Sequence, residues 1–331
     1  MARLLCWQII PYAGDSCKTG IEFQVMLTHE ELETLSALCG DTLRTRFAPS
    51  PTGYLHLGHA YSALVAWQAI DKQADSFHLR IDDLDSTRCK TEYTQQIFND
   101  LQWLGLEWRA PVHYQSARTQ RYRDMLGILQ ARDLIYPCYL TRKEADSLLL
   151  APHDAQNGLV PVPCTRHLLG SATSREREAS GMPPVWRLDS AQAIEAVQHR
   201  TPLAWQDHTG TRHHVNAAEF GDVVLARRDS PASYHLSTVI DDADSDITLV
   251  VRGADLAPVT QIHRLLQAVL DLPAPIYWHH PLICDAAGQR LAKRHDALSL
   301  KHLRQSGATP GDIAAQIAAA KTSIPKTSKQ G

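Results

Sequence analysis

The pattern of hydrophobic and polar positions in the first part of the chain alternates between short strand-like runs and longer helix-like stretches. Residues 43–47 and 77–81, each short and bounded by apolar side chains, are interpreted as buried strands. Longer stretches with an apolar stripe predict helices at residues 57–74, 93–104 and 116–132. We expect Ser116 to cap the last of these helices. The order of strand, loop, helix and strand predicts a parallel α/β sheet.

The middle of the chain, residues 136–220, breaks this pattern. It is rich in proline, histidine and short polar runs, so we interpret it as a lobe inserted into the sheet-forming domain. The alternation then resumes, with strands expected at 222–225 and 247–251, a helix at 259–270, and a strand, turn and loop at 282–291. We expect the ordered domain to begin at Thr42, because residues 1–41 show no clear period.

Composition narrows the class of protein. With 331 residues, of which 44% are hydrophobic, the chain can form one large or two modest domains. The net charge of -3 gives no overall attraction to nucleic acid, so any RNA contact must use a local basic surface. No apolar run approaches the ~20 residues that cross a bilayer. The 7 cysteines are odd in number and scattered, unlike a disulfide framework. We expect a cytoplasmic protein that binds no membrane.

The strongest chemical signal is the string from Arg46 to His59, at the junction of a predicted strand and helix. In an open α/β sheet a nucleotide binds at such a junction, where the helix N-terminus offers N–H groups to phosphate. Gly58 allows close approach to the backbone, and His56 and His59 can donate hydrogen bonds to charge that develops on a phosphate. Two histidines alone indicate no more than a polar turn, but the whole string favours a nucleotide site.

This string resembles the glutamyl branch of the class I aminoacyl-tRNA synthetases, and His56-Leu57-Gly58-His59 resembles their "HIGH" signature. Further blocks match in the same order, at residues 79–85, 222–225, 234–236, 241–242 and 250–256, and residues 290–294 occupy the place of the mobile "KMSKS" loop. The resemblance extends from about residue 42 to residue 295. It implies a Rossmann-type parallel sheet with an inserted lobe, and activation of L-glutamate with ATP and Mg²⁺.

The resemblance also implies roles for individual residues. The expected L-glutamate pocket consists of Arg46, Phe47, Ala48, Pro49, Ser50, Asp82, Tyr234 and Arg252. The expected ATP site consists of His56, Gly58, His59 and Lys293, of which His56, His59 and Lys293 are expected to be catalytic. Guanidinium groups suit bidentate contact with carboxylates, and Asp82 can hold the ammonium group. The chain departs from the family at Asp82, where most relatives have glutamate, and at Thr238, Leu256, Arg290 and Ala292.

The inserted lobe begins with a segment that resembles a zinc-binding stretch of related proteins. Cys138 and Cys164 remain, but Leu140 and Val160 stand where the other two ligands would be. Since structural zinc takes four ligands, we expect no zinc here. A site rebuilt with His153 or His167 is the alternative.

The domain division that we expect has five parts: an N-terminal extension of unknown role (1–41), two halves of the catalytic domain (42–135 and 221–300), the inserted lobe (136–220), and a C-terminal helix with a frayed tail (301–331). We expect no separate anticodon-binding domain. Such a chain resembles the glutamyl-Q tRNA(Asp) synthetases, in which activated glutamate goes to queuosine in the anticodon loop of tRNA(Asp). The implied partner is therefore the tRNA(Asp) anticodon stem-loop that carries queuosine.

Three alternatives remain open: a truncated glutamyl-tRNA synthetase, a nucleotidyltransferase that acts on a small molecule, and a non-catalytic RNA-binding paralogue. The altered Arg290 and Ala292 favour the last alternative, whereas His56, His59 and Lys293 speak against it. A basic helix face with Arg118, Arg121, Arg123 and Tyr122 could contact RNA, but the pattern favours an ordinary solvated helix.

Overall fold

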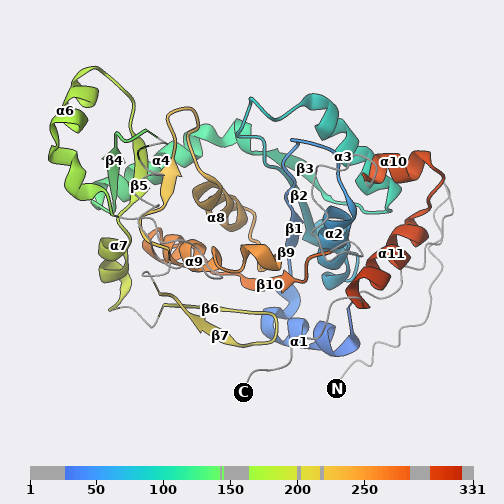
Figure 1. The fold of residues 1–331 in the computed structure, drawn as a ribbon. Coiled ribbons are helices and arrows are strands. Elements are labelled where there is room, and N and C mark those ends of the chain that lie inside the picture. Colours follow the sequence, from blue (N-terminus) through green and yellow to red (C-terminus); the bar gives the residue numbers. More distant parts are fainter. Residues whose placement is uncertain are drawn as a thin grey trace.

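The structure is a computed structural model that describes residues 27–141, 144, 164–199, 203–216, 220–283 and 299–322 (Figure 1). The helices are α1 (His29–Cys39), α2 (Leu57–Ala69), α3 (Thr91–Trp103), α4 (Thr119–Ala131), α6 (Ala172–Ala179), α7 (Ser190–Val197), α8 (Tyr234–Asp244), α9 (Thr260–Val269), α10 (Leu300–Gln305) and α11 (Pro310–Thr322). The strands are β1 (Thr45–Phe47), β2 (Phe77–Ile81), β3 (Arg109–Tyr114), β4 (Ile135–Cys138), β5 (Val185–Leu188), β6 (Ala204–Gln206), β7 (Arg212–His214), β8 (Val224–Ala226), β9 (Leu249–Gly253) and β10 (Ile276–His280). No helix in the described ranges is long and apolar enough to cross a membrane.

Parallel strands form the centre of the molecule, which confirms the predicted α/β class. β1, β2 and β3 pair in parallel, and β9 and β10 form a second parallel pair. The two groups meet where the carbonyl oxygen of Arg44, just before β1, accepts a hydrogen bond from the Leu249 N–H at 3.0 Å. The strands therefore follow the order β3-β2-β1-β9-β10, and the chain reverses direction across the sheet between β1 and β9. In open α/β sheets this is the point where ligands bind.

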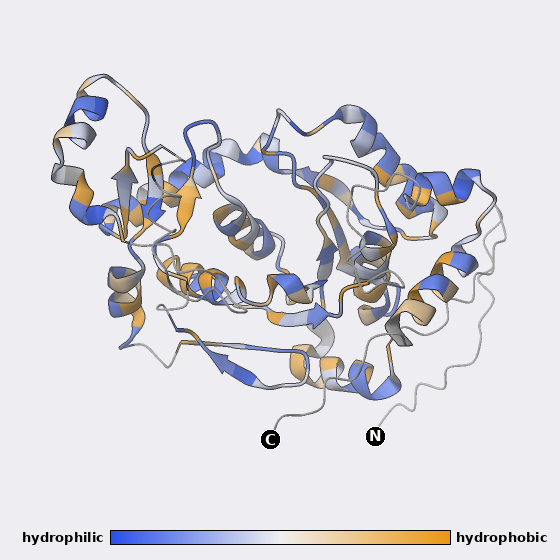
Figure 2. Ribbon diagram, viewed as in Figure 1, coloured by the Kyte–Doolittle hydropathy of each residue, from blue (hydrophilic) through white to orange (hydrophobic). Residues whose placement is uncertain are grey.

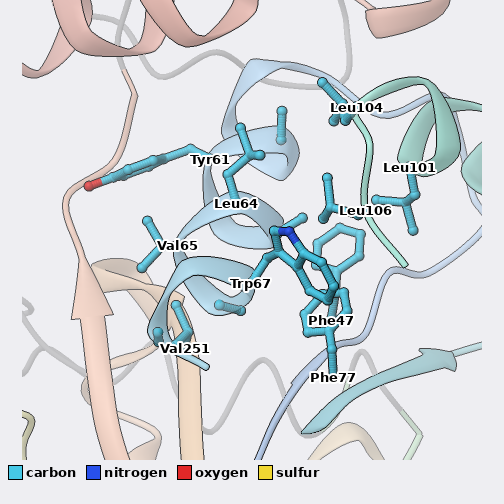
Figure 3. Packing of buried hydrophobic residues seen from close by; sticks show 14 of the residues in the cluster. Phe47, Tyr61, Leu64, Val65, Trp67, Phe77, Leu101, Leu104, Leu106 and Val251 are labelled. Carbon is cyan, nitrogen blue, oxygen red and sulfur yellow. The ribbon is translucent and has the colours of Figure 1, made fainter. Parts of the chain in front are cut away.

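The core beneath this sheet is built around α2 (Figure 3). Leu64 and Val65 of α2 are fully buried, and the Trp67 ring packs edge-on against Phe77 of β2, with 5.4 Å between ring centroids. Burying a large apolar side chain stabilises a fold by roughly 1.5–3 kcal/mol. Hydrophilic residues gather instead on outer helices such as α3 and α10 (Figure 2). The first turn of α2 is therefore held rigidly beside the sheet.

Two strands of the sheet were not predicted. β3 contains Pro111 and is largely exposed along the sheet edge, so it has no apolar run. β10 ends in His279 and His280, and lies before the strand that we expected at 282–291. Residues 281–283 are not a strand, and residues 284–291 lie outside the described ranges.

Two other expectations about elements were wrong. Ser116 does not cap a helix, because its N–H and hydroxyl donate to the Asp83 carboxylate at 2.8 and 2.7 Å, and α4 begins at Thr119. The helix expected to reach residue 74 ends at Ala69, since Asp71 and Lys72 adopt positive φ angles. The strand expected at 222–225 is confirmed as β8, which pairs antiparallel with β5 in the β4-β5-β8 sheet, outside the parallel sheet.

Ordered structure also begins before Thr42, contrary to expectation. In α1 the Thr28 hydroxyl accepts from the Glu31 N–H, and the Glu31 carboxylate accepts from the Thr28 N–H at 2.7 Å. This reciprocal capping box fixes the start of the helix. Leu27 and Leu35 are buried in the same core as α2, so the segment is part of the folded body.

Candidate active site

A cavity of about 880 Å³ opens at the carboxyl ends of the parallel strands, between the first turns of α2 and α8. The structure brings every described residue of the predicted site to its wall: Arg46, Phe47, Ala48, Pro49, Ser50, His56, Gly58, His59, Asp82, Tyr234 and Arg252. Lys293 lies outside the described residues, as do Arg290 and Ala292. The segments that follow β1 and β2 are joined at the cavity wall, because the Asp82 N–H donates to the Pro49 carbonyl oxygen at 3.1 Å.

The first turn of α2 fixes both signature histidines. The Nδ1 atom of His56 accepts from the Gly58 N–H at 3.1 Å, and the Nδ1 atom of His59 accepts from the His56 N–H at 3.2 Å. An Nδ1 atom that accepts a hydrogen bond leaves the ring proton on Nε2. Both rings are therefore held as donors through Nε2, and their centroids lie 3.9 Å apart.

Gly58 makes this arrangement possible. A Cβ atom at this position would lie 3.0 Å from Cε1 and 3.2 Å from Nδ1 of His56. Such contacts are tighter than ordinary van der Waals packing, so a larger residue would push the His56 ring out of place. The glycine of the signature thus leaves room for the ring of the histidine two residues before it.

A buried network of charges lies behind the cavity wall. The Arg46 Nε donates to Asp242 at 3.0 Å, and Arg80 donates to Asp242 at 2.5 Å and to Asp82 at 2.7 Å. Burial raises the pKa of Asp82 to about 6, although the Arg80 guanidinium opposes this shift. Arg80 was missed as a site residue, although its place between apolar residues and two aspartates on a buried strand was a visible signal.

The network continues to α4 through Asp241. Its carboxylate accepts from Gln115 at 2.8 Å, from Arg118 at 2.7 Å and from the Tyr122 hydroxyl at 2.8 Å. Tyr122 is completely buried, and Arg118 and Arg121 both pair with Asp244. On the helix face that we considered for RNA, Arg118 and Arg121 are therefore engaged in internal ion pairs and Tyr122 is not exposed for base stacking, whereas Arg123 is exposed.

The charges of this network balance. Its members are Arg46, Arg80, Arg118 and Arg121, with Asp82, Asp241, Asp242 and Asp244. Four guanidinium groups thus face four carboxylates. Because burial of an unpaired charge is costly, this compensation is what allows so many ionised groups beside one cavity.

Arg252 differs from these arginines. It is 5% exposed and lines the cavity, yet it forms no ion pair with any carboxylate in the described part of the chain. Its guanidinium donates to Thr260 at 2.7 Å, to His263 at 3.1 Å and to His279 at 3.3 Å. Within the described ranges, a buried cation that lines the cavity and has no carboxylate partner is suited to contact with an anionic ligand.

The region of the expected zinc ligands forms hydrogen bonds within the protein. Cys138 is buried and accepts from the Thr165 hydroxyl at 3.6 Å, whereas Cys164 is exposed. The described residues contain no cluster of three or more potential metal ligands. His167 is exposed, and His153 and Val160 lie outside the described ranges, so the expectation about zinc stays a prediction.

Comparison with known proteins gives consistent matches over most of the chain. Residues 42–326 match the family model for the catalytic domain of class I tRNA synthetases (E and Q). The chain is 42% identical over 277 residues to the glutamyl-Q tRNA(Asp) synthetase of Rhodobacter capsulatus, covering 81% of this chain and 97% of that protein. The protein of the same name from Nitratidesulfovibrio vulgaris is 36% identical over 292 residues, covering 86% and 87%.

A solved structure is consistent with the family match. A glutamate-tRNA synthetase from Elizabethkingia anophelis superposes with a TM-score of 0.62 at 27% identity over 76% of this chain. The present chain spans about half of that protein, 52% of its length.

Proposed function

Because this chain belongs to the class I tRNA synthetases of the glutamate and glutamine group, we propose that it activates L-glutamate with ATP and transfers it to queuosine in the anticodon loop of tRNA(Asp). The observation that carries the choice of amino acid is the uncompensated, buried Arg252 in the same cavity as His56 and His59. The choice of acceptor is supported by relatives at 34–42% identity that are named glutamyl-Q tRNA(Asp) synthetase.

Activation joins a glutamate carboxylate oxygen to the α-phosphorus of ATP and breaks the bond to pyrophosphate, which leaves with the electron pair. The protein's task in such a reaction is to position the reactants and to stabilise charge. His56 and His59 donate through Nε2 to the phosphate oxygens, and Lys293 contacts the leaving pyrophosphate. Mg²⁺ would accompany the triphosphate and neutralise part of its charge. Asp229 and Asp255, whose exposed carboxylates lie on the cavity wall and are the ligand type that this ion prefers, would hold it.

The two carboxylates of glutamate have different fates, and this decides which one contacts Arg252. The reacting α-carboxylate loses its charge when it becomes a mixed anhydride. The side-chain carboxylate keeps its charge throughout, so a fixed buried cation matches it in every step. We therefore assign Arg252 and the neighbouring Tyr234 hydroxyl to the side-chain carboxylate, and Asp82 to the ammonium group.

The contact of Arg46 with glutamate remains part of the proposal, although its Nε is already bonded to Asp242. In this arrangement Arg46 supplies its outer N–H groups to the substrate while Asp242 holds it in place. ATP and tRNA are molecules of the cytoplasm, and we propose that the protein works there.

The test is exchange of radiolabel between pyrophosphate and ATP by the purified protein, with Mg²⁺ and no tRNA. We expect exchange to depend on L-glutamate, and we expect L-glutamine at the same concentration to give little, because its side chain carries no charge for Arg252. Background exchange with every amino acid would contradict the proposed activation.

A further inference from the structure

In the described part of the chain, Arg252 forms its side-chain hydrogen bonds with neutral groups from three elements. His263 and Thr260 come from α9, His279 comes from β10, and Tyr234 begins α8. The guanidinium also lies over the Tyr277 ring, 5.2 Å from its centroid. Its four hydrogen bonds to side chains all end on uncharged acceptors.

The hydrogen bonds fix the proton positions on the histidines. Since a guanidinium only donates, the Nδ1 atom of His263 must accept, and its proton must lie on Nε2. The Nε2 atom of His263 lies 3.3 Å from the Nδ1 atom of His235, and Nδ1 of His235 accepts its hydrogen bond. His279 accepts through Nε2 from the Arg252 Nε at 3.3 Å, so its proton lies on Nδ1.

None of these rings is in a position to become charged. His263 is 1% exposed and lies against Arg252, and burial together with that cation holds its pKa well below the usual value. The same two causes lower the pKa of His235 to about 4 and that of His279 to about 3. The three imidazoles therefore stay neutral whenever the protein works near neutral pH.

We propose that His263 and His279 are positioning residues that hold the inner N–H groups of Arg252 with neutral acceptors, which leaves the full positive charge for an acidic ligand in the cavity. This inference rests on the proposed function for the identity of that ligand, the side-chain carboxylate of glutamate. A carboxylate in place of His263 or His279 could accept the same hydrogen bond from Arg252. It would also form an ion pair with the Arg252 guanidinium, as Asp242 does with Arg80, and so compensate its charge.

The distinction between geometry and charge gives a direct experiment. His263→Asp and His263→Asn place side chains of nearly the same shape beside Arg252, one charged and one neutral. Glutamate-dependent pyrophosphate exchange gives KM for glutamate, KM for ATP and kcat for each variant. His199→Asp, at an exposed position of the lobe, controls for the added negative charge.

We expect His263→Asp to raise KM for glutamate at least 30-fold above that of His263→Asn, with KM for ATP little changed. The glutamate-to-glutamine preference should fall in the same variant, because the cation is no longer available to the substrate. His263→Asn should raise KM for glutamate only several-fold, because its shorter amide holds the guanidinium less well.

His279→Asp and His279→Asn form a second pair at a less buried position, and decide the question if the His263 variants do not fold. Equal KM values for the aspartate and asparagine variants would overturn the inference, since charge would then not matter. That outcome is distinct from failure of the proposed function, in which the wild-type protein itself would show no glutamate-dependent exchange.

Discussion

Two arginines of the site have the same side chain and similar burial but opposite electrostatic surroundings. Arg80 is 3% exposed and pairs with Asp82 and Asp242, whereas Arg252 is 5% exposed and contacts neutral acceptors. Replacing each by glutamine therefore removes the same charge from two different environments. We expect the two variants to fail in different ways, Arg80→Gln in stability and Arg252→Gln in glutamate binding.

The expected magnitudes follow from the contacts. Arg80→Gln leaves the buried Asp82 carboxylate without its partner and leaves Asp242 with Arg46 alone. Breaking a buried pair in this way costs about 3–5 kcal/mol of stability. Arg252→Gln leaves only neutral acceptors, at a cost of about 1–2 kcal/mol. For the second variant we expect kcat/KM for glutamate to fall ~10²–10³-fold, since a charge-assisted contact with the substrate is lost.

Urea unfolding followed by tryptophan fluorescence measures the first quantity, and glutamate-dependent pyrophosphate exchange measures the second. Exchange is measured well below the unfolding midpoint of each variant, so that lost activity does not reflect unfolded protein. If Arg252→Gln lost as much stability as Arg80→Gln, the charge of Arg252 would be compensated inside the protein. Unchanged kcat/KM for glutamate would remove Arg252 from the site.

Three further predictions concern other parts of the molecule. Gly58→Ala should lower kcat for exchange about 10-fold or more by displacing the His56 ring, yet leave stability within about 1 kcal/mol, because alanine favours helix; an unchanged kcat would mean that the ring position is not critical. Lys293→Ala should lower kcat ~10²–10³-fold with little change in KM for glutamate, and an unchanged rate would show that this lysine does not act on the phosphates. Asp100 is fully buried, and burial raises its pKa to about 6, above its value in the unfolded chain. The unfolded state therefore loses this proton first as pH rises from about 4 to 6, and stability falls over that window. Asp100→Asn should be more stable than wild type above pH 6, by on the order of 1–3 kcal/mol, and lose this advantage near pH 4; equal stabilities at pH 8 would contradict the shift.

The sequence was sufficient for the parts of the site that lie on one continuous segment. The string from Arg46 to His59 contains the strand, the phosphate-facing turn and the helix start, so local rules predicted its placement. It was also sufficient for the parallel sheet class. β3 and β10 were not predicted. β3 is an edge strand that contains a proline, and β10 ends in two histidines, so neither has the apolar pattern of a buried strand.

What the sequence did not reveal depends on contacts between distant segments. Arg80 and Asp242 are 162 residues apart, and nothing local indicates that they form an ion pair. The same holds for Arg252 and His279, which meet only because β9 and β10 pair in parallel. Charge compensation at Arg80, and its absence at Arg252, is therefore visible only in the folded protein.

The central claim is that activated glutamate is transferred to queuosine in tRNA(Asp). The queuosine cyclopentene-diol can supply the hydroxyl that attacks the mixed anhydride, in the way that a terminal ribose hydroxyl does for other synthetases. The most direct measurement incubates the protein with ATP, Mg²⁺ and radiolabelled glutamate, together with tRNA from wild-type cells or from cells unable to make queuosine. We predict an alkali-labile label only on the first pool, and its loss when periodate cleaves the diol beforehand. Equal labelling of both pools, or label at the 3′ end of tRNA(Glu), would contradict the assignment and favour a truncated glutamyl-tRNA synthetase.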